Sequence, residues 1–123
     1  MRTPISYALA WPERLNWTDA KFDLAAMEHL SFAAVDIKRF PCFGLARQAL
    51  CEGGAAPAVL NAANEVAVDA FLKKLISFNR IQDVVHNVLD RSSYGVVDSL
   101  GSVTAVDDEA RFLAFNAVKK YQT

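Results

Sequence analysis

The sequence predicts an all-α protein, with a C-terminal four-helix bundle-like domain preceded by a short helix and an irregular linker arm. Three observations lead to this class. Apolar residues recur at helical spacing in four segments after residue 40. Proline and glycine mark the ends of these segments, and one segment has so narrow a polar stripe that helices must surround it. The expected boundaries are residues 1–12 for the short helix, 13–40 for the arm and 41–123 for the bundle.

A short helix is expected over residues 4–10. Thr3 offers a hydroxyl N-cap and Pro4 suits the first helical position, while Pro12 ends the run. A helix of about two turns is marginal by itself. This one therefore needs a surface to pack against.

The segment from residue 11 to residue 40, which contains the arm, has no clear periodicity. A single helical turn in 22–30 and a short strand over Leu30–Phe32 are both compatible with its sequence. It carries four large aromatic residues, Trp11, Trp17, Phe22 and Phe32. Connections of this length are uncommon unless they pack over a surface. Two explanations are open: the arm wraps the bundle, or it lies against a domain outside this chain.

The first bundle helix is expected from Pro41 to Cys51, with Gly53 and Gly54 as a left-handed cap. Its predicted apolar face comprises Cys42, Leu45, Ala46, Ala49 and Leu50. The helical repeat places Cys42 and Cys51 on opposite faces, where they cannot form a disulfide. Both are expected to be small core or boundary residues.

The central helix is expected from Ala56 to about Lys74, and the domain is arranged around it. Its apolar arc comprises Ala56, Val59, Leu60, Ala63, Val66, Ala67, Ala70 and Phe71, with Val68 and Leu72 at one edge. Only Glu65, Asp69 and Lys73 form a stripe that requires water. Asn61 and Asn64 border the arc. Because a buried amide needs hydrogen-bond partners, each is expected to bond a neighbouring segment.

The next helix has the most regular amphipathic pattern. After a brief extended link over 76–78, Asn79 and Gln82 have the spacing of a capping box. The predicted core stripe comprises Ile81, Val84, Val85, Val88 and Leu89. His86 falls off this stripe, so a solvated or boundary histidine is expected.

The last helix is expected to follow a loop over 92–101 and to begin near Thr104 or Asp107. The acidic residues 107–109 near its start and the lysines 119–120 near its end suit the helix dipole. Its predicted core stripe comprises Ala110, Leu113, Ala114, Ala117, Val118 and Tyr121. Phe112 and Phe115 lie on the other side, where they either meet a partner or decorate the surface.

Composition argues against several classes of function. The net charge of −1 and the lack of long basic runs argue against nucleic-acid binding. No apolar stretch reaches the roughly 20 residues of a membrane span, and the start lacks a secretory signal, so a cytoplasmic protein is expected. No Cys or His falls at a metal-binding spacing, and no glycine-rich phosphate loop is present. The residues alone predict no self-contained active site.

Five blocks, in order along the chain, resemble the C-terminal third of 1-deoxy-D-xylulose 5-phosphate reductoisomerases. They are Met1–Ile5, Ala10–Pro12, Leu30–Phe32, Phe40–Cys42 with Leu45 and Ala46, and Ala56–Val68. The resemblance implies an enzyme of non-mevalonate isoprenoid biosynthesis which, when complete, rearranges and reduces its substrate with NADPH and a divalent metal, Mg or Mn. It also implies that residues 1–12 are the edge of a catalytic domain.

The family's NADPH-binding domain, metal ligands and phosphate-binding residues have no counterparts here, so no catalytic or metal-binding residue is carried over. Met1 alone matches a family position near the substrate and nicotinamide. Asn61, Asn64 and Glu65 are expected to hold structure together. The chain alone is expected to be inactive and to support the missing domains, and a homodimer stays open. The alternative is a free-standing helical interaction module without enzymatic activity.

Overall fold

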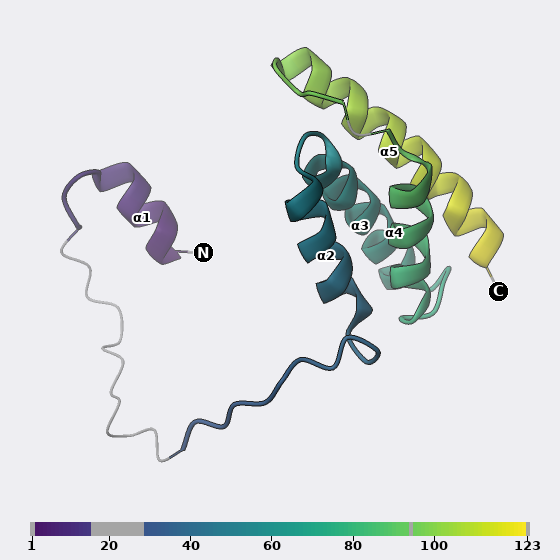
Figure 1. Cartoon of the computed structure of the whole chain (residues 1–123), viewed down its shortest axis with the longest axis horizontal. Helices are drawn as coiled ribbons and strands as arrows, with labels where there is room; N and C mark the ends of the chain where they lie inside the picture. Colours follow the sequence, from purple (N-terminus) through teal and green to yellow (C-terminus); the bar gives the residue numbers. More distant parts are fainter. Residues whose placement is uncertain (1, 16–28, 94, 123) are drawn as a thin grey trace. The chain divides into compact units, whose positions relative to one another are not determined.

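The computed structural model describes residues 2–15, 29–93 and 95–122 of the chain. These ranges contain five α-helices and no strand, which confirms the all-α class (Figure 1). The helices are α1 (Arg2–Ala10), α2 (Pro41–Glu52), α3 (Ala56–Leu72), α4 (Arg80–Arg91) and α5 (Leu100–Tyr121). In the described part of the chain, no helix is long and apolar enough to cross a membrane.

The chain divides into two compact units, residues 1–34 and residues 35–123. The first unit contains α1, which confirms the short helix expected over 4–10 and begins slightly earlier, at Arg2. The Leu9 side chain of this helix is 81% exposed. A short helix that buries so little apolar surface has little packing to stabilise it.

Of the two local structures compatible with the sequence of the arm, the short strand is not formed. Residues 29–36 have no regular secondary structure, so Leu30–Phe32 does not form the short strand that its sequence left open. Phe32 is 91% exposed and has no sheet to pack on, and an isolated extended segment is not stable as a strand. The helical turn expected in 22–30, together with Trp17 and Phe22, lies almost entirely outside the described residues.

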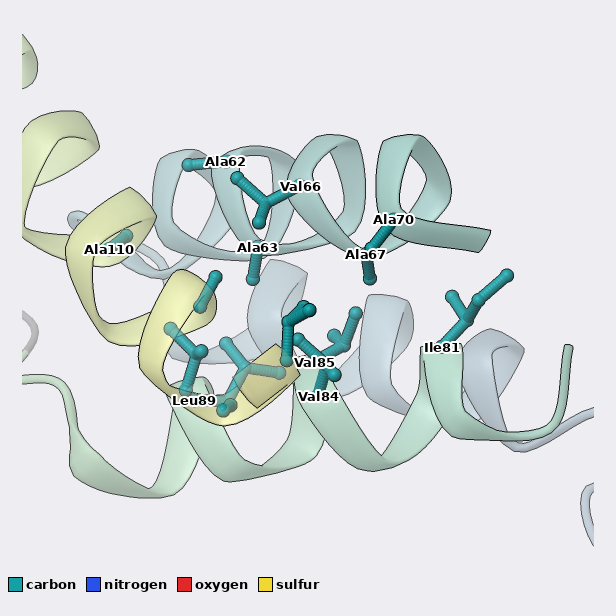
Figure 2. Close-up of a cluster of buried hydrophobic side chains, with 14 of the residues drawn as sticks. Ala62, Ala63, Val66, Ala67, Ala70, Ile81, Val84, Val85, Leu89 and Ala110 are labelled. Carbon is teal, nitrogen blue, oxygen red and sulfur yellow. The ribbon is translucent and has the colours of Figure 1, made fainter. Parts of the chain in front are cut away.

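In the second unit, α3 packs against α2, α4 and α5, as expected of the central helix. Its buried surface is built largely from alanines, and Ala62, Ala63 and Ala67 are completely buried (Figure 2). Small side chains at a helix contact allow the two backbones to approach closely. The short side chains of α3 therefore let three helices pack around it.

The larger core side chains come mainly from α4. Its expected stripe is buried in full: Ile81, Val84, Val85, Val88 and Leu89. The predicted stripe of α5 is also confirmed, with Leu113 and Tyr121 partly buried at its edge. Burying a valine side chain contributes about 1.5–3 kcal/mol. Leu72 departs from its prediction and is 70% exposed, because α3 ends there.

The glycine cap predicted at the C-terminal end of α2 is confirmed, whereas the capping box predicted at the N-terminus of α4 is wrong. Gly53 and Gly54 have φ angles of 68° and 52°, the left-handed region that glycine adopts without strain. Asn79 has helical backbone angles and its side chain makes no capping bond. The chain instead enters α4 through a turn, in which the Arg80 N–H donates to the Ser77 carbonyl at 2.9 Å.

The N-terminus of α5 lies earlier than predicted. The Ser99 hydroxyl accepts a hydrogen bond from the Ser102 backbone N–H, and the Ser102 hydroxyl accepts one from the Ser99 N–H. This reciprocal capping box starts the helix at Leu100, so the starts expected at Thr104 or Asp107 are wrong. The acidic residues 107–109 consequently lie inside the helix rather than in its first turn.

α2 packs on α3 and α4, but only part of its predicted apolar face reaches the core. Ala49 is buried and Leu45 packs against the core, but Leu50 is 75% exposed. Cys42 and Cys51 are free, as expected, yet both are exposed rather than core or boundary residues. Neither cysteine is among the buried core side chains of the described residues.

Candidate functional site

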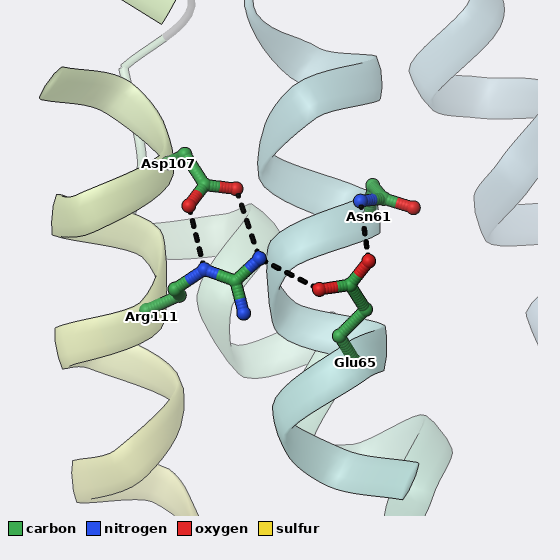
Figure 3. A network of polar contacts seen from close by, with 4 residues as sticks. All are labelled: Asn61, Glu65, Asp107 and Arg111. Carbon is green, nitrogen blue, oxygen red and sulfur yellow. Dashed lines mark hydrogen bonds and ion pairs between the residues drawn. The ribbon is translucent and has the colours of Figure 1, made fainter. Parts of the chain in front are cut away.

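The polar residues of α3 and α5 form one network (Figure 3). At its centre, the Arg111 Nη2 donates to Glu65 Oε2 at 2.6 Å, and the Arg111 Nε donates to Asp107 Oδ2 at 2.5 Å. The Asn61 Nδ2 donates to the other Glu65 oxygen at 3.1 Å. These four side chains link the central helix to the last one.

Two pairs of this network lie within single helices and follow from helical spacing alone. Asn61 and Glu65 are four residues apart on α3, and Asp107 and Arg111 are four apart on α5, so each pair shares a helix surface. Glu65 and Arg111 are 46 positions apart and meet only because α3 packs on α5. The bond between them therefore depends on the correct packing of these two helices.

Hydrogen bonding within the network shifts two pKa values. The bond from Arg111, and secondarily that from Asn61, lowers the pKa of the Glu65 carboxyl. The bonds to Asp107 and then to Glu65 raise the pKa of the Arg111 guanidinium. A carboxylate with a lowered pKa is a poor general base near neutral pH. The network is thus suited to holding helices together rather than to transferring protons.

The structure places the predicted polar residues differently from the expectation. Asn61 and Asn64 are both exposed rather than partly buried. Asn61 bonds Glu65 of its own helix, so the direct bond expected to a neighbouring segment is wrong. Asn64 makes no hydrogen bond with the residues that the structure describes. Met1 lies outside those residues.

Sequence reasoning missed Arg111 and assigned Asp107 to a helix cap. The spacing of four residues between the two was a usable signal, because opposite charges at that spacing are neighbours on a helix. The predicted position of the helix start concealed it. With α5 starting at Leu100, both residues lie well inside the helix and face α3.

A groove of about 410 Å³ lies where the N-terminal ends of α2 and α4 meet the side of α3. Phe43, Val68 and Phe78 give it apolar walls, and Asn64 and Gln82 add amide groups. Concave apolar surfaces with a few polar groups are the usual form of binding sites. This groove has that form, and a second groove of about 480 Å³ lies beside it between α2 and α4.

Other polar side chains do not add a catalytic set. His86 is exposed, as expected, and its Nδ1 lies 2.8 Å from an Asp90 carboxylate oxygen. Burial raises the pKa of the Cys42 thiol, which keeps it protonated and weakly nucleophilic near neutral pH. In the described ranges, no three His, Cys, Asp or Glu side chains gather as a metal-binding group would require.

The Glu65→Gln variant is expected to lose the part of the bundle's stability that depends on the ionised Glu65 carboxylate. Because the folded-state pKa of Glu65 is lowered, its contribution is fully present above the ordinary carboxyl pKa and is lost as pH falls through the folded value. We expect the melting temperature of the variant to fall below that of the unmodified chain near pH 7, and the difference to shrink on acidification to about pH 3. Circular dichroism melts across this range measure it.

Glu109→Gln is the matched control, because Glu109 is exposed on α5 and has no ion pair with any residue of the described ranges. Its melting temperature is expected to follow the unmodified chain at every pH. If the melting-temperature difference between Glu65→Gln and the unmodified chain stayed constant as pH fell, the ion pair with Arg111 would not account for the effect.

Comparison with known proteins identifies the family. The sequence profile described as the DXP reductoisomerase C-terminal domain matches residues 1–113. The 1-deoxy-D-xylulose 5-phosphate reductoisomerase of Pseudomonas paraeruginosa is 50% identical over 121 residues, which cover 98% of this chain and 31% of that protein. That of Ralstonia nicotianae is 55% identical over 111 residues, covering 90% of this chain and 28% of the relative. The chain thus spans less than a third of the length of either relative.

Solved structures agree with the sequence match. The Zymomonas mobilis reductoisomerase in complex with NADPH superposes with a TM-score of 0.83 at 42% identity, over 96% of this chain and 31% of that one. A reductoisomerase in complex with NADPH, fosmidomycin and magnesium gives a TM-score of 0.80 at 35% identity, over 95% of this chain and 31% of that one. The resemblance seen in the five sequence blocks is therefore confirmed, and the chain belongs to the DXP reductoisomerase C-terminal domain family.

Proposed function

We propose that this chain serves as the C-terminal helical domain of a functional DXP reductoisomerase. The complete enzyme would rearrange and reduce 1-deoxyxylulose 5-phosphate to 2-C-methylerythritol 4-phosphate with NADPH and a divalent metal, Mg or Mn, in non-mevalonate isoprenoid biosynthesis. The observation that carries this proposal is the match of nearly the whole chain to about a third of such an enzyme, at 50% identity.

In this proposal the chain supports the catalytic domain rather than performing the chemistry. Residues 1–12 would form an edge of the catalytic domain, residues 13–40 the connecting arm and residues 41–123 the supporting bundle. The exposed apolar side chains of α1, such as Leu9, favour an edge role, because they would be covered by such a domain. Met1 would lie on the substrate and nicotinamide side of the pocket.

Within the described ranges, the donor set does not fit a resident divalent metal, because no three suitable side chains lie together. In this proposal no catalytic step falls to these residues, and the other domains would bind NADPH and the metal. The remaining role for Asn61, Glu65 and Arg111 is to fix the orientation of α5 on α3, as their hydrogen bonds favour.

The purified 123-residue chain is expected not to oxidise NADPH when supplied with 1-deoxyxylulose 5-phosphate and Mg²⁺. Absorbance of NADPH measures the reaction, and the complete Pseudomonas paraeruginosa relative in the same assay is the positive control. Substrate-dependent oxidation by the chain alone, removed by adding chelator, would contradict the supporting role.

A second candidate function is a free-standing interaction module without enzymatic activity. It is favoured by Phe112 and Phe115, which are 66% and 54% exposed on one side of α5. Paired exposed aromatic side chains are frequent at protein interfaces. A stable homodimer of the isolated chain, detected by its mass in solution and lost when Phe112 is changed to Ser, would favour this function.

A further inference from the structure

The groove between α2, α3 and α4 leaves aromatic side chains exposed to water. Phe40, Phe43 and Phe78 line it and are 55%, 44% and 69% exposed. Asn64 lies on the same surface without a hydrogen bond to any described residue. Apolar side chains around a concave surface gain free energy when a partner covers them, and a free amide can pair with a partner's backbone.

The neighbouring groove of about 480 Å³ between α2 and α4 is more polar, because Gln48, Asp83 and His86 line it beside Ile37 and Leu45. Phe115 borders a smaller hollow of about 170 Å³ between α3 and α5, and three of the residues that line it are charged: Asp69, Lys73 and Lys119. Phe112 lines neither that hollow nor the 410 Å³ groove. An apolar segment would therefore bury more surface, and meet fewer charges, in the groove of α2, α3 and α4.

The position of the groove also indicates its occupant. The arm joins the bundle at the start of α2 (Figure 1). Phe40 and Pro41, which lie at this junction, line the groove themselves. Since the family is a C-terminal domain and the match spans 31% of a relative, most of such an enzyme precedes the arm. A partner attached through the arm is present at high effective concentration.

We propose that this groove is the docking site for an apolar segment of the preceding catalytic portion of the same polypeptide. Phe43 and Phe78 would pack on apolar side chains of that segment, and Asn64 would pair with its backbone. This inference rests on the proposed function, because only a complete reductoisomerase carries the occupant. A second copy of this chain is the competing occupant.

The test uses a chimera in which this chain replaces the matching 121 residues of the Pseudomonas paraeruginosa reductoisomerase. Phe43→Asp places a carboxylate in the groove, and Asn64→Asp is a milder variant that alters only an exposed amide. Phe112→Asp is the matched control on α5. Each substitution is also made in the 123-residue chain, whose melting temperature reports folding of the bundle.

We expect Phe43→Asp and Asn64→Asp to speed heat inactivation of the chimera by about tenfold or more, because docking would bury an unpaired charge. The isolated chains should melt as the unmodified chain does, and Phe112→Asp should change neither protein. Unaltered inactivation of both groove variants would overturn the inference. Faster heat inactivation confined to Phe112→Asp would also overturn it, as would a dimer of the isolated chain that Phe43→Asp dissociates. An inactive unsubstituted chimera would instead refute the proposed function itself.

Discussion

Val88→Asp is expected to abolish cooperative unfolding of the bundle. Val88 is completely buried on α4, and no polar side chain is buried among the described residues of this core. An uncompensated buried charge costs about 3–5 kcal/mol, in addition to the lost burial of the valine. Small domains are stabilised by only about 5–15 kcal/mol in total. The substitution therefore removes much or all of the stability, and a urea titration followed by circular dichroism measures the loss.

Val103→Asp is the control with the same change of side chain. Val103 is 38% exposed near the N-terminus of α5, where the helix dipole favours an acidic side chain. We expect its unfolding midpoint to stay close to that of the unmodified chain. Equal losses for the two variants would contradict the assignment of Val88 to a shared core of α3, α4 and α5.

The bundle was predictable from sequence because local pattern and final packing agree in α3 and α4. The spacing of Ile81, Val84 and Val88 fixes one face of a helix, and that face is the one buried. Helix starts were less predictable, because several polar residues compete to cap each one. At α5 the reciprocal Ser99 and Ser102 bonds start the helix before the acidic residues that looked like a start.

The polar network could be predicted only within each helix. The pairing of Glu65 with Arg111 joins positions 46 residues apart and follows from packing of α3 on α5, which spacing in one sequence does not reveal. Asn61 and Asn64 were expected at a buried border, but both are exposed. The reason is that α2 covers less of α3 than the narrow polar stripe suggested, so this side of the helix stays open.

The chimera itself carries the largest expected effect on activity. At 50% identity over 121 residues, the buried positions of α3, α4 and α5 are expected to fill the same volume as those of the relative. Cores tolerate hydrophobic exchanges that conserve volume and pattern. A bundle that folds by itself and docks through its own surface should therefore replace the relative's bundle and restore turnover.

Turnover by this unsubstituted chimera tests the central claim most directly. NADPH oxidation dependent on 1-deoxyxylulose 5-phosphate and Mg²⁺ is expected at a rate comparable to that of the complete relative, while a version lacking the matching segment should be inactive. A chimera that folds, as judged by its circular dichroism and melting transition, yet fails to oxidise NADPH would contradict the assignment of this chain as a working reductoisomerase C-terminal domain.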